Sequence, residues 1–222
     1  MDIEKEFEKI GGTFLTPSRE IGSSLSKIKG FIFDWDGVFN DGRKSDDSGS
    51  NFSEIDSMGL NIMRFDYWLR NGHLPYIYII TGMNNHSASW FAKREHLDGV
   101  YMNFKNKREA LQDICNNANI KPEETTFIFD DILDLELAQL CGLSFMAGRK
   151  SNPLMLDYVI RNKTCNYISG HSGQDHAVRE ICEMITGISG DYNRALELRI
   201  RFTGEYEEYF NLRNSIETSI KP

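Results

Sequence analysis

Short apolar runs that end in polar clusters recur along the chain and predict the strands of a buried parallel sheet. The four clearest runs cover residues 30–34, 76–81, 125–130 and 143–147 (GFIFD, YIYIIT, TTFIFD and LSFMA). Residues 99–103 and 165–168 are weaker candidates. Strands buried on both faces are continuously hydrophobic, as these are, whereas half-exposed strands alternate apolar with polar positions.

Helical patterns separate these runs. Residues 60–70 carry apolar side chains at helical spacing and are followed by Asn71-Gly72, which is a helix-stop signal. Residues 85–97, 107–118 and 134–141 repeat the plan, and Gly142 stops the last of them. Strands that alternate with helices predict an α/β fold with a doubly wound, Rossmann-like parallel sheet.

One segment interrupts the alternation. Residues 41–56 (DGRKSDDSGSNFSEID) are polar, with a Ser-Gly turn near their middle. This pattern predicts a β-hairpin flap directly after the first strand, and a plain surface loop is the alternative. No gap between the predicted strands is long enough for a large cap domain.

The two ends of the chain lie outside this pattern. We expect a catalytic domain over residues 27–187, preceded by a partly helical extension over residues 1–26. A short helix is predicted to begin near Ser18, after Pro17. Residues 188–222 are predicted to form a helical extension, with one long helix weakened or bent at Gly204.

Composition narrows the classes of function. The formal charge of the 222-residue chain is −8, and its lysines and arginines do not cluster. A nucleic-acid partner is therefore not expected, since duplex binding depends on a basic face. The chain shows no signal peptide and no membrane-spanning run, and its four separated cysteines fit a reducing compartment, so a cytoplasmic protein is expected.

The candidate chemistry lies where the strong strands end. Asp34 and Asp36 follow the first strand, Thr81-Gly82 follows the second, and Asp130-Asp131 follows the third, while Lys107 comes after a weaker strand. Open α/β sheets bind ligands at the carboxyl ends of their strands. Carboxylates that converge there repel one another unless a cation lies between them, and hard oxygen ligands of this kind suit Mg²⁺.

This set of groups matches the needs of phosphoryl transfer through an aspartyl-phosphate. One carboxylate attacks phosphorus, while a metal ion bridges that carboxylate and a phosphate oxygen. A second carboxyl group, two residues further on, protonates the leaving group and later activates water. A hydroxyl and an ammonium hold the remaining phosphate oxygens.

The motifs resemble those of the haloacid-dehalogenase (HAD) superfamily. FDWDGVFNDG resembles its motif I and IITG its motif II, while NFKNKREAL and FDDILDLELAQ resemble motifs III and IV. IDSMGL and HAVREI resemble segments of the capless phosphatases that act on 3-deoxy-D-manno-octulosonate 8-phosphate or on nonulosonate 9-phosphates. The resemblance runs from about residue 27 to residue 187.

The resemblance implies a role for each matching residue. Asp34 is expected to be the nucleophile and a metal ligand, Asp36 the general acid/base and a ligand through its backbone carbonyl, and Asp130 the third ligand. Thr81, Gly82 and Lys107 are expected to hold the phosphate, and Asp56 of IDSMGL to contact substrate. Asp131 and Asp134 are expected just outside the metal ligands, with Asp131 orienting Lys107 or a metal-bound water.

The family resemblance also implies a phosphorylated sugar-acid substrate and a homotetramer, in which the flap and a neighbouring subunit's tail cover each site. Some positions depart from the family pattern, namely Phe129 for glycine, Leu133 for asparagine and Met83 after the Thr-Gly pair. Two alternatives therefore stay open. One is a catalytically weak scaffold of the same fold, and the other is a phosphatase for a different small phosphorylated metabolite.

Overall fold

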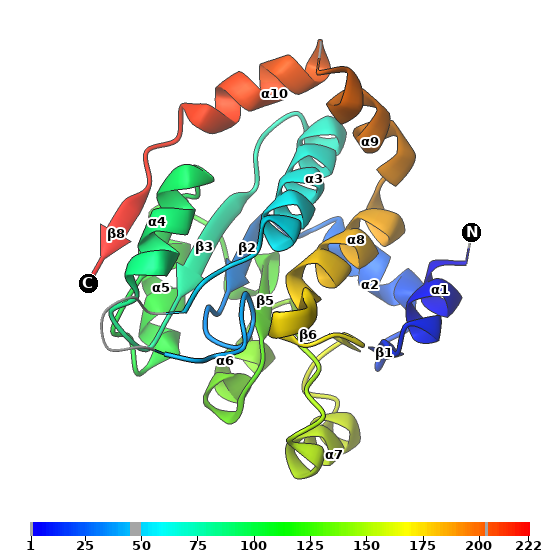
Figure 1. Ribbon diagram of the computed structural model, residues 1–222, viewed down its shortest axis with the longest axis vertical. Helices are drawn as coiled ribbons and strands as arrows, with labels where there is room; N and C mark the ends of the chain where they lie inside the picture. The colour runs from blue at the N-terminus through cyan, green and yellow to red at the C-terminus, as the bar shows by residue number, and fades with distance from the viewer. Residues whose placement is uncertain (1, 45–49, 203) are drawn as a thin grey trace.

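The computed structural model describes residues 2–44, 50–202 and 204–222 (Figure 1). Within this part of the chain, eight strands form one sheet in the order β1-β7-β6-β5-β2-β3-β4-β8. Every neighbouring pair is parallel except β1 and β7. The predicted doubly wound parallel sheet is confirmed. The strands are β1 Thr13–Phe14, β2 Gly30–Phe33, β3 Tyr76–Ile80, β4 Gly99–Tyr101, β5 Thr125–Phe129, β6 Leu143–Met146, β7 Tyr167–Ile168 and β8 Ser219–Lys221.

Helices cover both faces of this sheet. Phe31 and Phe33 of β2 belong to the hydrophobic cluster under α2, α3, α4 and α8, whereas Ile32 belongs to the cluster under α5, α6 and α7. This alternation explains why the strands are apolar at every position. The helices are α1 Ile3–Lys9, α2 Ser18–Leu25, α3 Glu54–Asn71, α4 His86–Arg94, α5 Lys107–Ala118, α6 Leu135–Leu140, α7 Pro153–Asn162, α8 Ala177–Ser189, α9 Tyr192–Arg201 and α10 Glu205–Asn214.

The flap segment is only partly described. Residues 41–44 and 50–53 contain no strand, and residues 45–49, at the predicted turn, lie outside the described residues. The predicted flap extends too far along the chain, because Glu54 to Asp56 form the first turn of α3 instead. Ser53 explains this earlier start, since its side chain accepts a hydrogen bond from the Ile55 backbone N–H as an N-cap.

Both ends of the chain add strands to the sheet. The predicted helix at Ser18 is confirmed as α2, and β1 before it pairs with β7. The predicted C-terminal helix is interrupted near Gly204, where weakening was expected, but the interruption is complete and leaves two helices, α9 and α10. Phe202 and Gly204 have positive φ angles of 50° and 60°, which end α9 and separate it from α10. Both helices pack outside α3, and the chain then returns to pair β8 with β4 (Figure 1).

No helix in the described part of the chain combines the length and the apolar character that a membrane crossing requires. The four cysteines are free, as expected. No inserted cap domain interrupts the sheet within the described ranges.

Candidate active site

Four adjacent parallel strands bring the candidate residues to one edge of the sheet. Asp34 directly follows β2, Thr81 follows β3, Asp130 follows β5, and Arg149 lies three residues after β6. In the sheet these strands stand in the order β6-β5-β2-β3. A cavity of about 630 Å³ opens there, lined by Asp34, Asp36, Asp41, Gly42, Lys44, Gly82, Met83, Phe104, Lys105, Lys107, Asp130, Asp131, Leu133, Asp134 and Arg149.

Three buried carboxylates converge in this cavity. Asp34, Asp130 and Asp134 each offer an oxygen, and these oxygens all lie within 4.8 Å of one another. Burial raises the pKa of Asp34 to about 8, with a further increase from the charge of Asp134 and a decrease from Lys107. Burial likewise raises the pKa of Asp130 to about 7, against the effect of Arg149. Such mutual repulsion is relieved by a cation, so the cluster suits a divalent metal ion.

Lys107 is a cation that contacts two carboxylates of this cluster. As the first residue of α5, it lies with Nζ 2.6 Å from Asp34 Oδ1 and 2.5 Å from Asp134 Oδ1. Burial favours the neutral amine, but the two carboxylates outweigh it and hold the pKa of Lys107 above its ordinary value. Lys107 is therefore a charged group beside the predicted nucleophile.

Asp134, rather than Asp131, holds Lys107. The exposed Asp131 instead caps the short helix Ile132–Asp134, where its side chain accepts a hydrogen bond from the Ile132 backbone N–H at 2.7 Å. The expected pairing of Asp131 with Lys107 is therefore corrected, while the alternative role of Asp131, orienting a metal-bound water, stays a prediction. Asp134, expected only outside the metal ligands, belongs to the carboxylate cluster itself.

Asp36 is oriented from outside the cluster. Its carboxylate accepts hydrogen bonds from Ser50 Oγ at 2.6 Å and from Asn85 Nδ2 at 3.3 Å, and Lys44 Nζ lies 2.9 Å away. Lys44 and Ser50 flank the undescribed part of the flap. The flap segment therefore contacts the predicted general acid/base directly.

The fully buried hydroxyl group of Thr81 has no hydrogen-bond partner among the described residues. A buried hydroxyl without a partner is costly unless a ligand or water satisfies it. Gly82 lines the cavity next to it, with no atom within 4 Å of where a Cβ would stand.

Asp56 is not in the cavity. Its carboxylate is fully buried between α3 and α8, where it accepts a hydrogen bond from the Arg179 backbone N–H at 2.9 Å and lies 3.3 Å from His176 Nδ1. The expected contact with substrate is thus corrected to a contact that joins two helices.

Sequence reasoning missed Arg149. Its Nη2 donates to Asp130 Oδ2 at 2.5 Å, which places a guanidinium at the edge of the carboxylate cluster. The available signal was its position just after the strand predicted at residues 143–147, on the same sheet edge as the aspartates. Gly37 leaves room for this pair, because a Cβ there would stand 2.0 Å from Asp130 Oδ2 and 2.5 Å from Arg149 Nη2.

The departures from the motif pattern do not fill the cluster. Phe129 points into the core, where it stacks on Phe127 with 5.8 Å between ring centroids. Leu133 and Met83 line the cavity, but their side chains are largely exposed. None of the three removes a carboxylate, hydroxyl or ammonium from the site.

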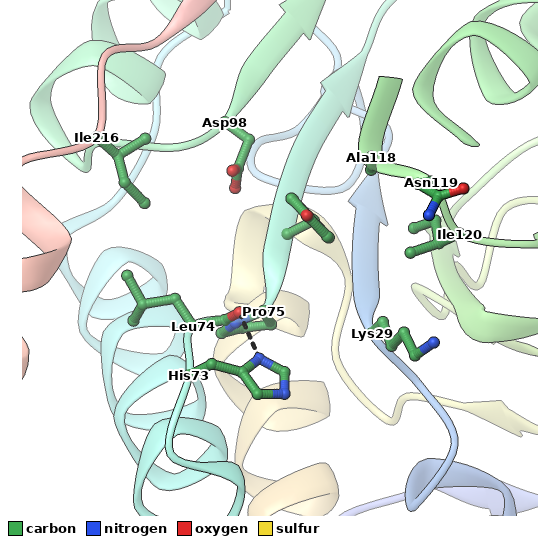
Figure 2. Close-up of a pocket in the computed structure, with 10 residues that line it drawn as sticks. Lys29, His73, Leu74, Pro75, Asp98, Ala118, Asn119, Ile120 and Ile216 are labelled. Atoms are coloured by element: carbon green, nitrogen blue, oxygen red, sulfur yellow. Dashed lines mark hydrogen bonds between the residues drawn. The ribbon is translucent and has the colours of Figure 1, made fainter. Parts of the chain in front are cut away.

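A second cavity, of about 500 Å³, lies at the opposite ends of the strands, between Lys29, Pro75, Asp98 and Ile216 (Figure 2). Its charged groups already have protein partners. Lys29 Nζ lies 2.7 Å from Glu124, and Asp98 Oδ2 accepts a hydrogen bond from the Ile77 backbone N–H at 2.7 Å. The chemistry therefore distinguishes the first cavity as the candidate active site.

Comparisons of the whole chain with known proteins found relatives of one kind, although no family model matches the chain. Over 183 residues, the chain is 28% identical to the 3-deoxy-D-manno-octulosonate 8-phosphate phosphatase of Escherichia coli, which covers 80% of this chain and 89% of the relative. A Legionella pneumophila structure described as a HAD superfamily hydrolase superposes with a TM-score of 0.67 at 24% identity, over 82% of this chain and 94% of the other.

A third match is the 3-deoxy-D-manno-octulosonate 8-phosphate phosphatase of Moraxella catarrhalis, solved with magnesium, phosphate and KDO. Its TM-score is 0.65 at 24% identity, over 83% of this chain and 99% of the other. The predicted resemblance to HAD phosphatases is confirmed. With it, the predicted class of enzyme, a phosphoric monoester hydrolase, is confirmed as well.

Proposed function

We propose that this protein is a Mg²⁺-dependent phosphatase that hydrolyses a phosphorylated sugar acid, an ulosonate phosphate of eight or nine carbons, through an aspartyl-phosphate on Asp34. The observation that carries the proposal is the convergence of Asp34, Asp130 and Asp134 around one point, with Lys107 beside them. Phosphoryl transfer needs a nucleophile, a cation and a clamp in this arrangement.

Asp34, Asp130 and the backbone carbonyl of Asp36 would hold the metal ion, with Asp134 close enough to contact it or its waters. When bound, Mg²⁺ supplies positive charge that offsets the repulsion between the carboxylates and the phosphate. Lys107 and the unpartnered hydroxyl of Thr81, together with the backbone at Gly82, hold the phosphate oxygens.

Asp34 then attacks phosphorus, and the bond between phosphorus and the sugar oxygen breaks. Ser50, Asn85 and Lys44 hold the carboxyl group of Asp36 at the cavity wall, and in its protonated form Asp36 gives its proton to the leaving alkoxide. In the second half-reaction Asp36 takes a proton from water, and the oxygen of that water displaces phosphate from Asp34. Both residues return to their starting states.

The substrate class rests on the relatives and on the charge of the cavity. The Escherichia coli relative acts on the 8-phosphate of an eight-carbon sugar acid, as its name states. Lys105 also lines the cavity, and its ammonium suits the carboxylate of such a substrate. The volume of about 630 Å³ accommodates a ligand of this size.

A panel of phosphate esters tests the proposal. Phosphate release is measured with Mg²⁺ from 3-deoxy-D-manno-octulosonate 8-phosphate, a nonulosonate 9-phosphate, glucose 6-phosphate and a nucleoside monophosphate. The sugar-acid phosphates are expected to give a kcat/KM at least about tenfold above the others. A preference for the hexose or the nucleotide would identify another substrate, and no turnover with any divalent metal would favour a scaffold.

We further propose a cytoplasmic homotetramer in which a neighbouring subunit covers the cavity. Met83 and Leu133 support this proposal, because both line the cavity and expose more than half of their surface. Apolar side chains around a polar site are typical of a surface that another chain covers. Light scattering at micromolar concentration tests it, and a monomer would contradict it.

A further inference from the structure

Cations hold one oxygen of every carboxylate in the cluster. Lys107 contacts Oδ1 of Asp34 and Oδ1 of Asp134, and Arg149 contacts Oδ2 of Asp130. Each carboxylate can therefore offer its other oxygen to a metal ion without disturbing an ion pair. Coordination through both oxygens of one carboxylate would require a cation to leave.

Arg149 is the part of this arrangement that belongs to no motif. It reaches Asp130 from the loop after β6, and its side chain is 31% exposed, whereas that of Asp130 is 4% exposed. The pair lies against the backbone of Gly37, which is the glycine of the D-W-D-G segment. The Asp130 oxygen that Arg149 holds is thus fixed on two sides, by the guanidinium and by the Gly37 backbone.

The number of available oxygens matters for the choice of metal. Mg²⁺ prefers octahedral geometry, keeps several waters and takes one or two carboxylates through single oxygens. Ca²⁺ takes six to eight oxygen ligands and often binds both oxygens of one carboxylate. A site whose carboxylates each present one oxygen therefore discriminates against the larger ion.

We propose that Arg149 is a specificity-determining residue that limits Asp130 to one metal-facing oxygen and thereby favours Mg²⁺ over Ca²⁺. This inference rests on the proposed function, because it takes the carboxylate cluster as the metal site. It goes beyond that function in assigning metal selectivity to a side chain that does not itself contact the metal.

Arg149 also contributes to stability, because it is the partner of a buried carboxylate, that of Asp130. The pair also places a positive charge next to a cation site, which weakens the binding of every divalent ion. That general effect acts on Mg²⁺ and Ca²⁺ alike, so the ratio of the two affinities separates it from selectivity.

The experiment measures Mg²⁺ and Ca²⁺ binding to the metal-free full-length protein by isothermal titration calorimetry. The variants are Arg149→Met, which removes the guanidinium but keeps an extended apolar chain, and Arg149→Gln as a neutral polar alternative. Lys150→Met is the matched control, because it removes one positive charge from the neighbouring exposed position. Circular dichroism checks that each variant is folded.

The wild-type protein is expected to bind Mg²⁺ more tightly than Ca²⁺. In Arg149→Met and Arg149→Gln, the affinity for Ca²⁺ relative to Mg²⁺ is expected to rise about tenfold or more, since a second Asp130 oxygen becomes available. Lys150→Met is expected to leave the ratio within about twofold of the wild type, since a charge outside the ligand set acts on both ions alike.

An Arg149 variant whose ratio matches that of Lys150→Met would overturn the inference. So would a wild-type protein that binds Ca²⁺ more tightly than Mg²⁺, and this second measurement needs no folded variant. If the wild type hydrolyses phosphate esters with Mg²⁺ but the ratio does not change in the variants, only the role of Arg149 fails. If the wild type binds neither ion, the proposed function fails with it.

Discussion

Asp34 and Lys107 form a buried ion pair, with 2.6 Å between the Oδ1 and Nζ atoms and each side chain 9% exposed. The same ammonium contacts Asp134 on its other side. Lys107 therefore fixes the orientation of the predicted nucleophile and, by proximity, lies where a transferring phosphoryl group would gather negative charge. Lys107 is therefore expected both to position Asp34 and to compensate the negative charge of the phosphoryl group.

Replacing Asp34 with asparagine tests the nucleophile. Asparagine has nearly the same shape but cannot form the aspartyl-phosphate, so Mg²⁺-dependent phosphate release is expected to fall by about a thousandfold or more. Asp157→Asn on α7 is the matched control, because Asp157 is exposed and pairs only with Arg161 among the described residues. Turnover within tenfold of wild type in Asp34→Asn would exclude Asp34 as the nucleophile.

Replacing Lys107 with methionine leaves Asp34 and Asp134 without their shared cation. Phosphate release is expected to fall at least about a hundredfold, since one charged donor to the phosphate is lost.

The metal-free Lys107→Met variant is expected to lose about 3 kcal/mol of unfolding free energy, because two buried carboxylates then lack a partner. Urea unfolding with and without Mg²⁺ measures this, and Mg²⁺ is expected to stabilise the variant more than the wild type. Equal stabilisation of both would show that the carboxylates do not share the metal.

Gly173 supports the motif I loop from behind. A Cβ at this position would stand 2.2 Å from the carbonyl oxygen of Gly37 and 2.4 Å from that of Asn40. Gly173→Ala is therefore expected to displace the loop and lower kcat about tenfold or more, because small displacements of catalytic groups are costly. In Gly22→Ala on α2, the nearest atom lies at 3.1 Å, so this control is expected to keep its activity. Equal activity in both variants would contradict the role given to Gly173.

Asp56 is expected to matter for stability rather than for substrate. Asp56→Ala leaves the backbone N–H of Arg179 without its acceptor, and removal of such a partner costs about 1–3 kcal/mol. Urea denaturation should show this loss, while KM of the folded variant stays within about twofold of wild type, since Asp56 does not line the cavity. A large rise in KM with unchanged stability would restore the original expectation of a substrate contact.

Asp98 provides a pH dependence of stability away from the active site. Burial raises its pKa in the folded protein, against the hydrogen bond from the Ile77 backbone N–H. In the unfolded chain Asp98 loses its proton above about pH 4, whereas in the folded protein it keeps the proton to a higher pH. The unfolding free energy of the wild type therefore decreases as the pH rises from about 4 through the pKa of Asp98 in the folded state. Asp98→Asn keeps an acceptor oxygen but has no proton to lose. Its unfolding free energy relative to wild type is expected to increase between pH 4 and pH 8, and a constant difference would contradict this.

The sequence predicted the parts of the fold that depend on local patterns. The strands at residues 30–34, 76–81 and 125–130 were recognisable because they are buried on both faces and end in polar groups. β1 and β8 were missed, because strands of two and three residues carry too short a pattern and form only where a neighbouring strand edge is available. The break between α9 and α10 depends on the positive φ of Phe202, which its residue type does not indicate.

The site residues likewise divide into those that the local sequence predicts and those that it does not. Residues that directly follow a strand, such as Asp34 and Asp130, were placed correctly at the sheet edge. Interactions that depend on side-chain direction were not predictable. Asp131 caps a helical turn while Asp134 holds Lys107, although both carboxylates lie within four residues. Arg149 was missed because its position after a predicted strand does not by itself show that its side chain extends toward Asp130.

The sheet that carries the proposed catalytic groups is completed by segments far from them in the sequence. β8 lies along β4, and the backbone N–H of Met102 donates to the Lys221 carbonyl oxygen. β1 lies along β7 at the other margin. A shortened version limited to residues 27–187 would leave two open backbone margins, which invite pairing between molecules and aggregation. Attempts to produce a minimal catalytic fragment should therefore retain both terminal segments.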